Sequence, residues 1–212
     1  MAVVTSYSTL LTAVADWLAR SNLTSFVPNY VQNFEEKFLR QPRNFGKWME
    51  ASIGSGSGIA ISTTAACPAD FLALKISYLD GQSQRPLNVY SIEQLYQAYP
   101  RGSGGGTPKF IARNVANFEF GPVPSGTFTL MGTYYAKPTL LRSFASDAAA
   151  HWLVVNAPDL LLYGALLEAM PFIKNDARIP VWQQMYADAL KDYRDLMKAQ
   201  NTSGGALQTL VA

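Results

Sequence analysis

The side chains best able to do chemistry are few, and they do not form a catalytic motif. His151 is the only histidine and Cys67 the only cysteine among the 212 residues. A Ser-His-Asp triad would need an ordered nucleophile and acid around His151, for which Ser146 and Asp147 are only generic candidates. One histidine and one cysteine cannot supply the usual ligands of a structural zinc site. We therefore predict no catalytic residue, no metal site and no cofactor.

Two other sets of residues resemble functional motifs without matching them. Glu35 and Glu36 are neighbours on a predicted helix, where they point in different directions, so we expect a solvated face rather than an acid pair. The glycine-rich stretches 54–58 and 102–106 lack the Gly-Lys-Ser/Thr of a P-loop and the strand-to-helix context of a dinucleotide fingerprint. We expect both stretches to be flexible loops.

The remaining candidates are residues that bind partner proteins. Basic side chains flank the second glycine-rich stretch and could meet an acidic surface, namely Arg101, Lys109 and Arg113. Near the C-terminal end, glycines 204 and 205 precede apolar side chains with no obvious place in a core, namely Leu207, Leu210 and Val211. We predict partner binding for these six residues, with a frayed terminus as the alternative for the last three.

Hydrophobic periodicity predicts a pair of helices at each end of the chain. Apolar residues recur at helical spacing from about residue 8 to 20 and from about 24 to 40, where Pro42 stops the second helix. In the last third, Asn156 is the predicted N-cap of a helix whose every face is apolar from Leu160 to Leu167. Such a helix must be covered by protein on most sides. A further amphipathic helix follows the predicted N-cap Asp176 and completes a helical hairpin.

Between the helical pairs the period changes from helical to strand-like. Residues 72–78 and 128–134 alternate between apolar and other side chains, and shorter strands are expected at 59–61, 110–111 and 118–120. We expect the strand at 118–120 to pair with the strand from Thr127 across the turn 121–126. A capping box of Ser91 and Gln94 predicts a short helix over 91–96.

The fold class is therefore α+β, with N- and C-terminal helical pairs forming a bundle and an antiparallel β-lobe inserted between them. The predicted boundaries are 1–43 for the N-terminal helices, 44–140 for the β-lobe, 141–200 for the C-terminal helices and 201–212 for a flexible tail.

Composition narrows the functional class. The chain is 49% hydrophobic and 12% aromatic but only 15% charged, with a formal net charge of +2 and no block of like charge. This balance argues against a dedicated nucleic-acid binder, and the low charge indicates a surface partly covered by other molecules. No apolar run approaches the roughly 20 residues that span a bilayer, and we see no secretory signal. A lone cysteine fits folding in a reducing cytoplasm.

Both ends of the chain resemble one known family, the head-to-tail adaptor proteins of tailed bacteriophages. The C-terminal residues that carry the resemblance are Ser146, Asp147, Trp152, Pro158-Asp159-Leu160, Leu162-Tyr163, Leu166-Leu167-Glu168-Ala169, Phe172, Trp182 and Tyr186. The N-terminal ones are Leu10, Val14, Trp17, Leu18, Arg20, Phe34, Glu35, Leu39 and Arg40. These are packing patterns rather than catalytic signatures, and the middle of the chain matches nothing we can name.

The resemblance implies a structural virion protein of the neck, assembled in the host cytoplasm. It implies a ring of identical subunits, typically twelve-fold, that docks on the portal protein, receives tail or nozzle proteins, and lets genomic DNA pass without sequence-specific binding. Two other classes stay open. One is a small phage or bacterial enzyme with a site in the β-lobe near His151. The other is a tail-side carbohydrate-binding module that uses Tyr90, Tyr96, Tyr99, Tyr134 and Tyr135.

Overall fold

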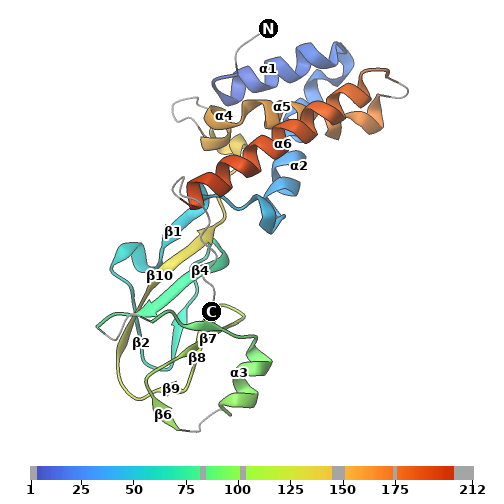
Figure 1. Ribbon diagram of the computed structural model, residues 1–212. Helices are drawn as coiled ribbons and strands as arrows, with labels where there is room; N and C mark the ends of the chain where they lie inside the picture. Colours follow the sequence, from blue (N-terminus) through green and yellow to red (C-terminus); the bar gives the residue numbers. More distant parts are fainter. Residues whose placement is uncertain (1–3, 82–84, 101–103, 145–150, 174–175, 203–212) are drawn as a thin grey trace. The chain divides into compact units, whose positions relative to one another are not determined.

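The chain folds into two compact units. The structure is a computed structural model that describes residues 4–81, 85–100, 104–144, 151–173 and 176–202. Unit 1 combines Met1–Trp48 with Thr139–Ala212, and unit 2 is Met49–Pro138. Helices from the two ends of the chain form unit 1, and largely antiparallel strands from its middle form unit 2 (Figure 1). The predicted α+β fold class is confirmed.

Unit 1 is built from helices of both halves of the chain. The α-helices are α1 (Tyr7–Leu18), α2 (Val27–Leu39), α4 (Trp152–Asn156), α5 (Pro158–Glu168) and α6 (Ile179–Asn201). Short 3-10 helices adjoin them: η1 (Ser21–Phe26), η2 (Pro42–Asn44), η3 (Lys47–Met49), η5 (Leu141–Phe144) and η6 (Met170–Phe172). Helix α1 begins with a reciprocal capping box between Ser6 and Thr9, which satisfies two otherwise free amides.

Helix α5 is the centre of unit 1, because it packs against α1, α2, α4 and α6. Leu160, Leu161 and Leu166 are fully buried, with 0% of their surface exposed. The expectation that this all-apolar helix is covered on most sides is therefore confirmed. At Gly164 a Cβ would lie 2.3 Å from an atom of the Phe34 ring, so α2 reaches α5 only because this residue has no side chain.

Two predicted helix starts were wrong. Asn156 does not cap α5; it is an exposed last residue of α4, and its side chain donates to the Trp152 carbonyl. The prediction failed because α4, too short to show a period, occupies the approach to Pro158. Asp176 does not cap α6 either. Its carboxylate accepts from the amide and guanidinium of Arg178, and the helix starts at Ile179.

Unit 2 contains two four-stranded sheets, a two-stranded pair, one α-helix and one 3-10 helix within its described residues. The first sheet holds β1 (Glu50–Ser52), β2 (Ile59–Ile61), β4 (Phe71–Leu79) and β10 (Phe128–Ala136), with β10 bonded to the other three. The second runs β3 (Thr64–Ala66), β8 (Asn117–Gly121), β7 (Phe110–Asn114) and β5 (Asn88–Val89). The two-stranded pair consists of β6 (Gly105–Gly106) and β9 (Val123–Pro124). The 3-10 helix η4 (Ile53–Gly56) follows β1. Helix α3 (Ile92–Ala98) begins with the predicted capping box of Ser91 and Gln94.

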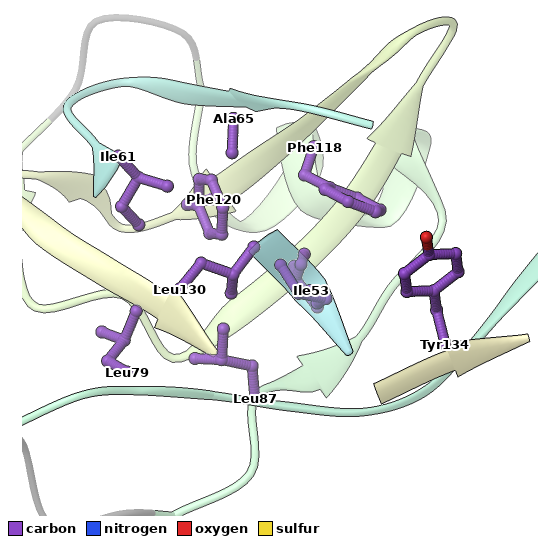
Figure 2. Close-up of a cluster of buried hydrophobic side chains, with 10 residues drawn as sticks. Ile53, Ile61, Ala65, Leu79, Leu87, Phe118, Phe120, Leu130 and Tyr134 are labelled. Carbon is purple, nitrogen blue, oxygen red and sulfur yellow. The ribbon is translucent and has the colours of Figure 1, made fainter. Parts of the chain in front are cut away.

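The two larger sheets share one hydrophobic core. Figure 2 shows side chains of both sheets converging on it, including Ile61 and Leu130 from the first sheet and Phe118 and Phe120 from the second. Leu130 and Ile61 are completely buried. The two sheets are therefore held together by apolar burial rather than by a shared ladder.

The predicted pairing of the strand at 118–120 with the strand from Thr127 was wrong. Strand β8 pairs with β7 and β3, and β10 lies in the other sheet. Both edges of β8 are occupied, one by β3 and one by β7, so no edge is left for β10, and the chain passes through β9 into the other sheet. Two short pairs, β5 with β7 and β6 with β9, are also parallel rather than antiparallel.

We predict that Leu166→Ala lowers the free energy of unfolding of unit 1 by about 2–5 kcal/mol, because it leaves a cavity in the centre of the bundle. Since all four tryptophans (Trp17, Trp48, Trp152 and Trp182) lie in unit 1, tryptophan fluorescence during urea unfolding measures this change. The control is Val155→Ala, at a side chain that is 58% exposed, which should change stability by less than about 0.5 kcal/mol. Equal effects of the two substitutions would contradict the central role of α5.

Candidate functional site

His151 is part of the packing of unit 1. It is 6% exposed, its ring meets those of Trp48 and Phe144 edge-on, and its Nδ1 accepts from the amide of Leu153 as the N-cap of α4. Burial lowers the pKa of His151, with a hydrogen bond to the backbone of Thr139 as a smaller opposing cause. Ser146 and Asp147, the triad candidates, lie outside the described residues. The lowered pKa favours the neutral imidazole, which here serves as a helix cap and a packing partner.

Glu35 is the largest departure from the sequence analysis. The expected solvated face is wrong for this residue, because Glu35 is 1% exposed and both its carboxylate oxygens accept from the amide of Leu141, at 3.0 and 3.1 Å. Burial raises the pKa of Glu35 to about 7, although the Leu141 amide opposes the shift and Glu36 adds to it. Glu35 therefore fastens the chain to α2 just after residue 139, where it returns to unit 1.

Arg178 joins the two helical pairs of unit 1. Its guanidinium donates to the carbonyls of Trp17 and Leu18 at the end of α1, at 2.8 and 3.1 Å, and lies over the Trp182 ring. An arginine here satisfies carbonyls that no helical amide reaches. Asp176 holds the guanidinium at 2.7 Å, and this bond lowers the pKa of Asp176 to about 2. In the sequence, the only sign of this contact was the spacing Asp-X-Arg just before a helix.

A line of aromatic rings runs through unit 1. The rings form two series, in which the centroids of neighbouring rings lie 5.1–6.5 Å apart. The short series is Phe26, Phe172 and Tyr30. The long series is Tyr186, Phe34, Phe38, Tyr193, Trp152, Trp48, His151 and Phe144. Four of these residues, at positions 26, 30, 34 and 38, recur every four residues along η1 and α2. Edge-on and offset contacts of this kind stabilise beyond the area they bury.

A half-open cavity of about 150 Å³ lies beside this line, between α2, α5 and α6. We call it the aromatic groove, and its walls are Phe34, Phe38, Gln41, Gly164, Leu167 and Tyr186, with Lys37 and Glu168 at its edge. Lys37 donates to Glu168 at 2.6 Å, and the lysine side chain is 58% exposed. The groove thus combines an apolar floor with a charged rim, which suits an apolar side chain of another molecule.

Of the six predicted partner-binding residues, the structure describes two. Lys109 precedes β7 and Arg113 is near its end, so about 13 Å of extended chain separates them. Arg113 is also committed within unit 2, because its guanidinium lies 5.1 Å from the centre of the Phe71 ring and its Nε donates to the Val115 carbonyl. Both residues are exposed, but they do not form one patch. Arg101, Leu207, Leu210 and Val211 lie outside the described residues.

The tyrosines considered for carbohydrate binding do not all lie on one surface. Tyr134 is 6% exposed in the core of unit 2, with its hydroxyl donating to Asp70. Tyr90 and Tyr99 both pack on the Phe110 ring, and the Tyr96 hydroxyl donates to Glu119. These contacts position side chains within unit 2.

The chemistry-bearing side chains are therefore dispersed. No group of three or more His, Cys, Asp or Glu residues that could hold a metal occurs in the described part of the chain. Within the same residues, no helix is both long enough and apolar enough to cross a membrane.

The described residues define a class of protein: helices from both ends of the chain form one unit, an inserted β-unit lies between them in the sequence, and the notable features are buried polar anchors and an apolar groove. The family model described as SU10 adaptor protein matches residues 5–208. The chain belongs to this family of phage head-to-tail adaptors, which confirms the resemblance drawn from its sequence. No curated protein matches the chain.

Glu35 gives unit 1 a specific pH dependence. Its pKa is higher in the folded than in the unfolded chain, so its stabilising contribution is complete below about pH 4.5 and is lost as the pH rises through about 7. We predict that the unfolding free energy of the wild type, relative to Glu35→Gln, falls by about 3 kcal/mol between pH 4.5 and 8. Tryptophan fluorescence in urea at each pH measures this difference.

The glutamine keeps an oxygen that can accept from Leu141, so Glu35→Gln is a matched control for the backbone contact. Comparing the two proteins also cancels His151, whose depressed pKa acts in the opposite direction by destabilising the fold as the pH falls below about 6.5. Parallel pH profiles for the two proteins would show that Glu35 has no raised pKa.

Proposed function

We propose that this chain is a structural protein of the virion neck, where copies of it form a ring that docks on the portal protein and receives tail or nozzle proteins. DNA passes through the channel of the ring without base recognition. The ring is twelve-fold if it matches the symmetry of the portal. The observation that carries the proposal is membership of a phage adaptor family over residues 5–208.

The described residues agree with a role that is geometric rather than catalytic. His151 is used as a cap and a packing partner, and Glu35 as an anchor for the amide of Leu141. A net charge of +2 on 212 residues also suits a channel wall that must let DNA slide, because strong phosphate binding would retard it.

The proposal is tested with purified heads that contain the portal but lack neck proteins. We expect the wild-type chain to bind these heads and to appear as a ring beneath the portal vertex in averaged electron micrographs, and portal-free heads to bind none. Failure to bind portal-containing heads, or equal binding to portal-free heads, would reject the adaptor role.

The apolar residues of the tail supply a sharper prediction. Each of Leu207, Leu210 and Val211 contributes about 1.5–3 kcal/mol when buried, before the cost of ordering the chain, and a ring multiplies the effect through high effective concentration. Truncation after Ser203 should therefore leave the melting temperature unchanged and weaken binding to heads by at least about tenfold.

Two full-length variants serve as controls for this truncation. Leu207→Ala with Leu210→Ala should reproduce the loss of binding, whereas Gln208→Ala with Thr209→Ala should not. If the truncated chain binds heads as tightly as the wild type, attachment must use the described helices or strands instead.

Lys109 and Arg113 are proposed to add salt-dependent contacts with an acidic surface of the portal or tail. Since they lie about 13 Å apart along β7, they would act as two separate contacts rather than as a basic patch.

A further inference from the structure

Strand β4 lies at an edge of the first sheet of unit 2. It pairs with β10, which lies between β4 and β1 (Figure 1). Outside this ladder, the amide of Phe71 bonds back to the carbonyl of Pro68, and the carbonyl of Ser77 accepts from the amide of Leu87. Between these two bonds, the other edge of residues 72–76 has no main-chain partner in the part of the chain that the structure describes. About 17 Å of strand therefore presents unpaired amides and carbonyls, and we call it the open edge.

The open edge is accessible and has no charged guard. Its residues are half-buried or exposed, and Ile76 is 42% exposed. Proteins commonly protect such an edge with a lysine that points away from the sheet. Lys75 does not do this, because its ammonium reaches across β10 to Glu50 of β1, at 2.5 Å. The edge is therefore free to pair with another strand.

The shape of the open edge restricts what can pair with it. Leu72 and Lys75 have no opposite residue in β10, so β4 carries two bulges within five residues. Bulges bend a strand and strengthen its twist. A long, flat sheet edge of another molecule would fit poorly here, whereas a short single segment can follow the twist. The open edge thus selects an extended peptide of about five residues that pairs through its main chain.

The C-terminal segment of the chain has the composition of such a peptide. Residues 206–211 contain no charged side chain and no proline, and Leu207, Thr209 and Val211 alternate with Gln208 and Leu210. This composition is compatible with a strand, and its six residues match the length of the open edge. The two glycines at 204 and 205 allow the backbone before the segment to turn in many directions.

We propose that residues 206–211 of one copy add a strand to the open edge of β4 in the next copy. The inference rests on the proposed ring and identifies a contact between its subunits. A closed ring requires two different surfaces on each subunit, because each copy meets its neighbours head to tail. The C-terminal segment and the open edge are such a pair. One added strand binds weakly by itself, but a ring holds each subunit through two such contacts.

The first test adds a synthetic peptide of residues 203–212 to the full-length chain at micromolar concentration. Hydrogen exchange followed by mass spectrometry reports the amides of β4. We expect the peptide to slow exchange in residues 72–76, because their outward amides gain partners. A chain whose own C-terminal segment already covered the edge would show no such change.

Two modified peptides distinguish strand pairing from other binding. One carries N-methyl groups on the amides of Leu207 and Thr209, and the other on those of Gln208 and Leu210. In a strand these two sets of amides point to opposite edges, so only one set can bond to β4. We expect one modified peptide to protect β4 at least about tenfold more weakly than the unmodified peptide, and the other to match it.

The second test uses substitutions in the full-length chain. We expect the wild type to self-associate with increasing concentration in sedimentation velocity, and an excess of the peptide to reverse this. Ile76→Lys places a charge at the open edge and should weaken association about tenfold or more. The matched control is Val89→Lys on β5, at the edge of the second sheet, where the side chain is 65% exposed; it should have no effect. Melting followed by circular dichroism verifies that both variants are folded.

The contact is overturned if millimolar peptide leaves exchange in β4 unchanged, or if both modified peptides bind equally well. Equal effects of Ile76→Lys and Val89→Lys would overturn it too. The proposed function fails separately, by absence of binding to portal-containing heads. Protection of β4 without head binding would reject only the adaptor role, and head binding without protection of β4 would reject only this contact.

Discussion

The structure depends on one constraint, which is that helix α5 has no polar face. From Leu160 to Leu166 every residue except the half-buried Tyr163 is buried, so water must be replaced by protein around most of the helix. The C-terminal residues alone cannot do this, because α4 and α6 cover only part of it. Helices α1 and α2, from the other end of the chain, complete the cover. The β-unit is therefore an insertion between two halves of a bundle that cannot fold separately.

Polar anchors hold the chain at both points where it leaves and re-enters unit 1. On the outgoing side, buried Asn44 donates to the Phe38 carbonyl and accepts from Arg194, and its own carbonyl accepts from the Tyr193 hydroxyl. The stack of Trp48 on Trp152, with ring planes 2° apart, follows four residues later. On the returning side Glu35 holds the amide of Leu141. Because buried polar groups are costly when unpaired, these contacts determine a single path for each crossing.

The sequence was sufficient where hydrophobic periodicity was strong. The lengths and order of α1, α2, α5 and α6, and the strands at 71–79 and 128–136, agree with the pattern of apolar residues. The sequence was insufficient where the local structure depended on a contact with a residue far away in the chain. Helical spacing places Glu35, unlike Glu36, on the same side of α2 as Val31 and Phe38, but only the amide of Leu141, 106 residues away, makes it a buried anchor. Strand pairing was similarly hidden, because β8 and β10 have suitable patterns for each other and nothing local shows that β3 and β7 take both edges of β8.

The aromatic groove was missed for a related reason. Loops and the tail have an unusual composition that makes them candidates from sequence, whereas the groove is formed by side chains that look like ordinary core residues. Phe34, Phe38 and Tyr186 line it only because Gly164 sets the spacing of α2 on α5, and the same three rings help to hold the bundle together.

A groove made from core residues has a physical advantage for assembly. Its walls are already fixed by packing, so a partner side chain enters without ordering them first, and the entropic cost of binding falls mainly on the partner. In a ring of the kind we propose, weak contacts of this preorganised kind would be sufficient, since each subunit would be held by two neighbours and dissociation would have to break both contacts. Substitutions in the groove would consequently affect folding as well as any binding there, because Phe34, Phe38 and Tyr186 both line the groove and hold the bundle together.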